Sequence, residues 1–167
     1  PGNVRLYASG PDANMLEAIR HDKLVIRVVS ERVGDAAAVK MCYGAITKGM
    51  IALGTEMMVA AQRLGVADML DTELRESRGE IRDWLLASIP PMPPKAYRWV
   101  PETREIAATF EQTGVTPRMM LGAADMYEFI AATPLGAESP EAARAEKRSA
   151  KAVISALAQS KGSFERR

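Results

Sequence analysis

The segment from Gly34 to Gly65 constrains the fold of this chain more than any other part of the sequence. Asp35 can cap a helix at its start and Gly65 can end it, which predicts one helix of roughly 29 residues. At about 1.5 Å per residue, that helix is on the order of 43 Å long, more than one small domain needs. It is rich in small residues, namely Ala36, Ala37, Ala38, Gly44, Ala45, Gly49, Ala52, Gly54, Ala60 and Ala61. Because small residues permit close helix approach, we expect the central helix of a bundle or the seam of a dimer.

The first 33 residues differ in character from the rest. Val4 to Ser9 alternates apolar and polar residues, and Leu24 to Ser30 is a second run of strand formers. Between them, Asp12 can cap a short helix from Ala13 to Arg20. A strand–helix–strand unit usually gives two parallel neighbours. Two strands are too few for a stable parallel sheet, so we expect the far edge of a larger sheet whose other strands lie upstream.

After Gly34 the sequence predicts helices, so the expected fold class is mainly α: a helical bundle around one long central helix. The expected domains are 1–33, the strand–helix–strand edge, and 34–167, an all-helical substrate and dimerisation domain. The later expected segments are a helix over Asp71 to Ile89, a stiff non-helical connector over Ser88 to Pro101, a helix from near Glu102 to before Gly114, a helix capped by Thr116 with Pro117 in its first turn and reaching Thr133, and a last helix from Ser139 and Pro140 to about Ser160.

Composition indicates a globular cytoplasmic protein and excludes several classes. No uninterrupted apolar run approaches the ~18 residues that span a bilayer, and the start lacks the features of a signal peptide, so no membrane partner is expected. The net charge is +1 and the basic residues are dispersed among acidic ones, so the sequence shows no basic patch that would bind nucleic acid. One cysteine and one histidine exclude a Cys/His zinc site and an internal disulfide, and no metal is expected.

Lys40 is the candidate for chemistry, because it lies near the start of the long helix. Tyr43, Gly44 and Thr47 follow it by three, four and seven residues and therefore share its face. A solvated surface lysine is one interpretation. The other is a general acid/base, since lysines that ordinarily titrate near ~10.4 shift towards neutrality on desolvation or near positive charge. Gly44 would leave room for a substrate, and the two hydroxyls could orient it.

The other titratable residues are weaker candidates. We expect His21 to be a solvated histidine in a turn and Cys42 to be a small buried apolar residue. Asp125, Tyr127 and Glu128 could supply polar groups to a cleft or belong to a solvated face. No GxGxxG dinucleotide motif occurs in the sequence.

Taken together, these residues resemble the C-terminal portion of the β-hydroxyacid dehydrogenase superfamily, which includes 6-phosphogluconate dehydrogenase, and most of all its NAD-binding phosphogluconate-dehydrogenase-like branch. The strands VRLYAS and LVIRVVS lead into Gly34-DAAAV-Lys40, the Gly-x5-Lys interval of the family, and then into a long small-residue helix. REIAATFEQTGVTP, from Arg104 to Pro117, is similar to the family's late helix, turn and proline. Two positions depart from the family pattern. Gly44 stands where an asparagine holds the substrate, and Glu102-Thr103 stands where many members have a Lys-Asp pair.

The resemblance implies hydride transfer between NAD or NADP and a hydroxy acid or related alcohol, with Lys40 as the catalytic acid/base. It further implies that the opening strands are the remnant of a Rossmann-type domain, and that Gly34 lies near the cofactor. An upstream dinucleotide-binding domain would carry most of the cofactor contacts, and the helical domain would form a homodimer.

Two other functions stay open. A non-catalytic helical dimerisation or interaction module would keep the fold without the chemistry, and the departures at Gly44 and Glu102-Thr103 favour it. An imine in place of the hydroxy acid is the third possibility, which the presence of Lys40 disfavours. A strand followed by GxGxxG upstream would separate the enzyme from the interaction module.

Overall fold

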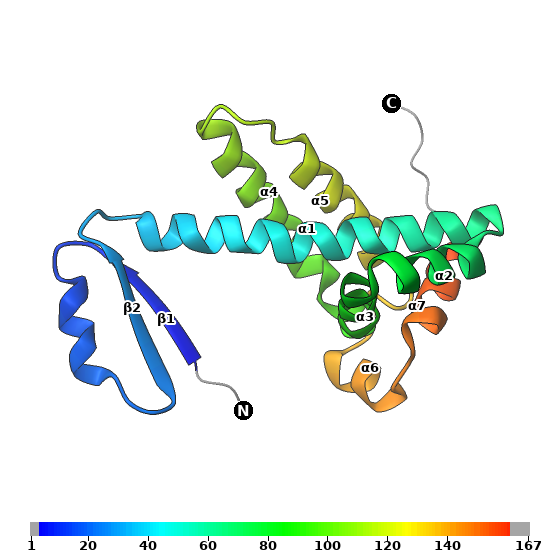
Figure 1. Ribbon diagram of the computed structural model, residues 1–167, viewed down its shortest axis with the longest axis horizontal. Helices are drawn as coiled ribbons and strands as arrows, with labels where there is room; N and C mark the ends of the chain where they lie inside the picture. Colours follow the sequence, from blue (N-terminus) through cyan, green and yellow to red (C-terminus); the bar gives the residue numbers. More distant parts are fainter. Residues whose placement is uncertain (1–3, 161–167) are drawn as a thin grey trace. The chain divides into compact units, whose positions relative to one another are not determined.

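The computed structural model describes residues 4–160 and is mainly α-helical, as predicted (Figure 1). The chain falls into two compact units, one ending at Gly44 and the other beginning at Ala45. The elements are β1 (Val4–Ser9), η1 (Ala13–Ile19), β2 (Leu24–Ser30), α1 (Asp35–Leu64), α2 (Ala67–Ser77), α3 (Gly79–Ser88), η2 (Pro93–Lys95), α4 (Ala96–Gln112), α5 (Arg118–Ala131), α6 (Pro140–Glu146) and α7 (Ala150–Gln159).

The first unit holds a two-stranded parallel sheet. β1 pairs with β2 in a register that runs from Val4 opposite Leu24 to Ala8 opposite Val28, with an irregularity at Ser9. Both strands have the predicted bounds, because Gly10 with φ 129° breaks the first and the charged turn around Glu31 follows the second. The predicted short helix is present, but it is a 3₁₀ helix.

The start of α1 is built differently from the prediction. Asp35 is the first helical residue, not the cap, and its carboxylate accepts hydrogen bonds from Ser30 Oγ at 2.6 Å and Arg32 Nε at 2.9 Å. These bonds lower the pKa of Asp35, the Ser30 bond most strongly. The hydroxyl of Ser9, at the end of β1, instead accepts from the Ala36 amide at 3.0 Å. A residue distant in sequence therefore satisfies the first turn of α1, which local pattern cannot reveal.

The helices between α1 and α5 also differ from the prediction. The expected helix over Asp71 to Ile89 is interrupted at Arg78 and forms α2 and α3. The expected connector over Ser88 to Pro101 is partly helical, because α4 begins at Ala96 and contains Pro101. The hydroxyl of Thr103 donates to the carbonyl oxygens of Trp99 and Val100, at 2.8 and 3.0 Å, and so supplies hydrogen bonds next to the proline.

The expected last helix is likewise two helices. α6 ends at Glu146 and is followed by Lys147, whose φ of 47° and ψ of 39° are left-handed; α7 begins at Ala150. Ser139 and Ser149 cap the two helices by accepting from the amides of Ala142 and Ala152. Two serine caps in place of one mark the interruption in the sequence.

The second unit packs its helices against one side of α1. α4 and α5 contact each other (Figure 1), and the Tyr127 hydroxyl of α5 donates to the Lys48 carbonyl oxygen of α1 at 2.6 Å. The fully buried large side chains of this unit are Tyr127, Ile89, Met92, Ile130, Leu157 and Val153. By length and mean hydropathy alone, α1 could also cross a membrane, and 17% of its most apolar window is buried in the described residues.

A glycine of α1 is required for this packing. A Cβ atom at Gly54 would overlap the side chain of Leu85, which is 3% exposed, whereas a Cβ at Gly49 would make ordinary contact with Met120 Sδ at 3.6 Å. The two glycines therefore predict opposite responses to alanine.

We expect Gly54→Ala to lower the free energy of unfolding by about 1–3 kcal/mol through overpacking. Gly49→Ala, the matched control, should be neutral or stabilise by up to about 1 kcal/mol through helix propensity. Urea denaturation measures both free energies of unfolding. The double variant Gly54→Ala with Leu85→Ala should be more stable than the sum of the two single effects predicts, because the shorter side chain at position 85 no longer overlaps the added Cβ atom. Equal effects of the two alanines would contradict close contact at Gly54.

Candidate functional site

Lys40 lies in the second turn of α1 with an exposed side chain. Within residues 4–160 it makes no side-chain hydrogen bond and no ion pair. Tyr43 is also exposed, Gly44 is buried and Thr47 is half-buried. The structure therefore leaves the Lys40 amine accessible, and the roles of these four residues stay predictions.

Gly34 directly precedes α1 with φ 99°, a left-handed conformation that favours glycine. A Cβ at this position would meet nothing within 4 Å. The backbone at the start of α1 is therefore open to close approach by another group.

The remaining predicted side chains have mixed outcomes. His21 is exposed in a turn, where Nδ1 accepts from the Lys23 amide at 3.3 Å, which confirms a solvated histidine. Cys42 is exposed on α1, so its predicted burial is wrong. Asp125 and Glu128 are exposed while Tyr127 is fully buried, and Glu128 pairs with Arg104. The three do not form a cleft.

A second lysine of α1 belongs to a polar cluster that the sequence analysis missed. Lys48 Nζ lies 2.9 Å from Glu102 Oε2 and 5.8 Å from the centroid of the Trp99 ring, and its side chain is only 19% exposed. Trp99 in turn contacts Tyr127 edge to face, with the ring centroids 5.2 Å apart. Trp99 and Glu102 stand three residues apart on α4, a helical spacing hidden by the expectation of a non-helical connector.

Burial raises the pKa of the Tyr127 phenol. The hydroxyl therefore stays protonated and donates to the Lys48 carbonyl oxygen. The cluster of Lys48, Trp99, Glu102 and Tyr127 fixes the rotation of α1 relative to α4 and α5.

A cavity of about 530 Å³ lies at the other end of the second unit, against the last turns of α1. Its apolar wall comes from α1, α2, α3 and α7, and includes Met58, Leu70, Leu74, Leu86 and Ile154. Its charged groups include Asp68, Asp71, Arg82, Arg148 and Lys151.

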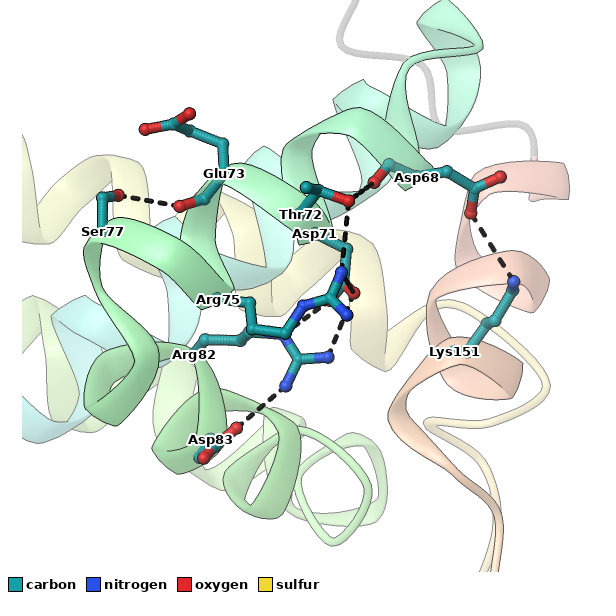
Figure 2. Close-up of polar contacts among 9 residues, drawn as sticks. All are labelled: Asp68, Asp71, Thr72, Glu73, Arg75, Ser77, Arg82, Asp83 and Lys151. Carbon is teal, nitrogen blue, oxygen red and sulfur yellow. Dashed lines mark hydrogen bonds and ion pairs between the residues drawn. The ribbon is translucent and has the colours of Figure 1, made fainter.

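A forked ion pair joins α2 to α3 beside this cavity (Figure 2). Arg82 Nε and Nη2 donate to Asp71 Oδ1 and Oδ2 at 2.7 and 3.1 Å, and Arg82 Nη1 donates to Asp83 at 2.9 Å. The Arg82 bonds lower the pKa of Asp71 and raise that of Arg82. Lys151 of α7 approaches Asp68 at 3.8 Å. Within residues 4–160, no cluster of three or more His, Cys, Asp or Glu side chains could hold a metal.

The pKa of the Asp71 carboxyl should lie below its ordinary value of 3.8, and Arg82→Gln should raise it towards that value, because the hydrogen bonds from Arg82 are the largest cause of the shift. Because the folded pKa is lowered, the pair stabilises the fold above pH 3.8, and this contribution is lost as pH falls through the folded pKa. Carboxyl ¹³C NMR measures the midpoint. An Asp71 midpoint unmoved by Arg82→Gln would contradict the forked pair.

Comparison with known proteins connects this fold to an enzyme family. Residues 61–130 match the family described as a domain of unknown function, DUF1932, which is the C-terminal domain of 3-hydroxyacid dehydrogenase-like proteins. The conserved protein MTH1747 of unknown function, whose structure is described as similar to 3-hydroxyacid dehydrogenases, matches 82% of this chain with 26% identity and a TM-score of 0.63. The resemblance to the C-terminal portion of the hydroxyacid dehydrogenase superfamily is confirmed.

Two further relatives have no assigned activity in their descriptions. A conserved hypothetical protein from Sinorhizobium meliloti 1021 shares the fold over 94% of this chain, with a TM-score of 0.73 and 23% identity. An uncharacterized 28.5 kDa protein of Methanothermus fervidus is 32% identical over 76 residues, which is 46% of this chain and 30% of that protein. This chain spans 52% and 54% of the two solved relatives. It is thus similar to an oxidoreductase-related C-terminal domain.

Proposed function

We propose that this chain is the catalytic-lysine and dimerisation portion of an NAD(P)-dependent oxidoreductase that acts on a hydroxy acid or related alcohol. The observation that carries the proposal is the exposed Lys40 in the second turn of α1, reached from a parallel strand through Gly34. The similarity to 3-hydroxyacid dehydrogenase-like C-terminal domains supports the reaction class.

The residues of this chain fit a nicotinamide cofactor at one point. The open, positive-φ backbone of Gly34 permits a flat group to approach the start of α1 without meeting a side chain. Most cofactor contacts would come from an upstream dinucleotide-binding domain, since this chain spans about half of its solved relatives. The cofactor supplies the acceptor or donor of hydride at the substrate carbon.

Lys40 then handles the proton of the substrate hydroxyl. On oxidation its neutral amine accepts that proton, and on reduction its ammonium returns it. Tyr43 and Thr47 would orient the substrate with their hydroxyls, and Gly44 would make room for it. Because Lys40 is exposed in this chain, the surroundings that desolvate the amine have to come from outside it.

Lys40→Ala in the full-length protein should lower kcat by about 10²–10⁴-fold, the range for loss of a general acid or base. The assay follows nicotinamide absorbance with a panel of hydroxy acids and both NAD and NADP. Lys23→Ala, which removes an exposed lysine of the turn before β2, is the matched control and should retain turnover. Turnover within a few-fold of wild type in Lys40→Ala would show that Lys40 is not the acid/base.

We propose a second copy of this chain as the partner of α1. Its uncovered face carries an apolar stripe at alternating spacings of four and three residues: Ile46, Met50, Leu53, Met57, Ala60 and Leu64. Ile46, Leu53 and Leu64 are 55%, 63% and 76% exposed. A stripe with this repeat fits a second helix along its length. The opposite side of α1 already packs against protein at Leu85 and Tyr127, which supports a helical partner over lipid.

Leu53→Glu should convert a dimer of the full-length protein to a folded monomer with an unchanged helical circular dichroism spectrum, because Leu53 contacts solvent in the single chain. Sedimentation velocity measures the change. Glu56→Gln, an exposed position one turn away, is the control and should remain dimeric. A dimer that persists in Leu53→Glu would place the interface elsewhere. We propose that the protein is cytoplasmic, because the exposed, unpaired Cys42 suits a reducing compartment. The sedimentation measurement is therefore made under reducing conditions.

A further inference from the structure

Two hollows of the second unit adjoin at Pro90 and Arg148. The larger is the apolar cavity of about 530 Å³, and the smaller has a volume of about 160 Å³. Both are lined by Pro90 and Arg148, so the two share a wall.

The smaller hollow is cationic. Lys95, Arg144, Lys147 and Arg148 line it, and no acidic side chain does. Arg148 is paired with Glu138 at 2.6 Å and with Glu146 at 3.9 Å. In the part of the chain that the structure describes, the other three cations form no ion pair. Lys95 is half-buried and Arg144 and Lys147 are exposed, so three positive charges without ion-pair partners among the described residues lie around one small space.

The backbone around these cations is restricted. Prolines at 90, 91, 94 and 140 line the same hollow, so its walls have few alternative conformations. Lys147 adopts a left-handed conformation that glycine adopts far more readily. Cations also stabilise the C-terminal end of a helix such as α6, but that effect requires neither the hollow nor the prolines.

The larger hollow complements this charge with apolar surface. Met58, Leu70, Leu74, Leu86, Pro90 and Ile154 line it. Its charged groups are paired: Arg82 with Asp71 through two hydrogen bonds, Lys151 with Asp68 at 3.8 Å (Figure 2), and Arg148 with Glu138. A hydrocarbon chain or ring system would therefore displace water from this surface without burying an unpaired charge.

We propose that the two hollows together bind an amphipathic organic anion. The phosphate or carboxylate would contact Lys95, Arg144 and Lys147, and the apolar body would occupy the larger cavity past Arg148. The inference does not depend on the role of Lys40.

Calorimetric titration of the full-length protein with butyl, hexyl and octyl phosphate tests the apolar half of the site. Affinity should rise roughly threefold to fourfold per added methylene group until the cavity is filled. Inorganic phosphate and neutral octanol should each bind at least about tenfold more weakly than octyl phosphate, because each lacks one half of the ligand. An affinity independent of chain length, or no saturable binding, would overturn the proposal.

Arg144→Gln combined with Lys147→Gly tests the charged half. Glycine suits the left-handed position, so the variant should fold with an unchanged or higher melting temperature. Its affinity for octyl phosphate should fall at least about tenfold, because the variant loses two of the three unpaired cations that contact the anion. Arg98→Gln combined with Arg118→Gln removes the same charge from exposed positions that line neither hollow and should bind as wild type.

Equal affinity in the two double variants would overturn the proposal, and Arg144→Gln with Lys147→Asn gives the same test should the glycine variant fail to fold. Sedimentation with vesicles of phosphatidylcholine and phosphatidic acid separates a free ligand from a lipid headgroup. We expect the protein in the supernatant. Co-sedimentation that octyl phosphate does not reverse would overturn the assignment to a small molecule.

Discussion

Close packing on one side of α1 is the constraint on which the helical unit depends. Gly54 lacks the Cβ atom that would overlap Leu85, and the buried Tyr127 hydroxyl donates to the Lys48 carbonyl oxygen on the same helix. Together these contacts fix which side of α1 faces α3 and α5. The rotation of a helix determines the direction of every side chain on it, so the same contacts leave Leu53 exposed and hold Lys48 beside Glu102.

This rotation gives the two sides of α1 different roles. Its covered side carries small and buried residues such as Ala52 and Thr55, and its uncovered side carries the apolar stripe offered to a second copy. Lys40 lies in the first turns, where Ser9 and Gly34 shape the entry from the sheet. One helix thereby joins the proposed chemistry to the proposed dimer.

Much of the architecture could be predicted because its signals are local. The alternation of apolar and polar residues, with the breakers beside it, predicted the bounds of both strands correctly. The left-handed Gly65 after Leu64 ends α1 where expected. The errors arose where the local pattern does not show which hydrogen bonds satisfy the backbone. The prolines between Ser88 and Pro101 predict a non-helical connector, yet Pro101 lies inside α4, where Thr103 donates to neighbouring carbonyl oxygens of the same helix.

The candidate sites divide in the same way. The interval from Gly34 to Lys40 is visible in sequence because both residues belong to one short segment. Two other features combine residues that are far apart in the chain, so no sequence spacing predicts them: the contact of Lys48 with Trp99 and the paired hollows around Arg148. The prediction of Asp35 as the cap was wrong for a related reason: Ser9, which is distant in sequence, accepts the hydrogen bond from the Ala36 amide in the first turn of α1.

Chemical rescue of the full-length Lys40→Ala variant tests the central claim most directly. Primary amines such as methylamine can occupy the space of the missing side chain and exchange the same proton. The account predicts that added amine restores turnover saturably, with a rate that depends on the amine pKa as a Brønsted relation requires. Wild-type turnover without amine, or a depressed turnover that no amine raises, would contradict Lys40 as the acid/base.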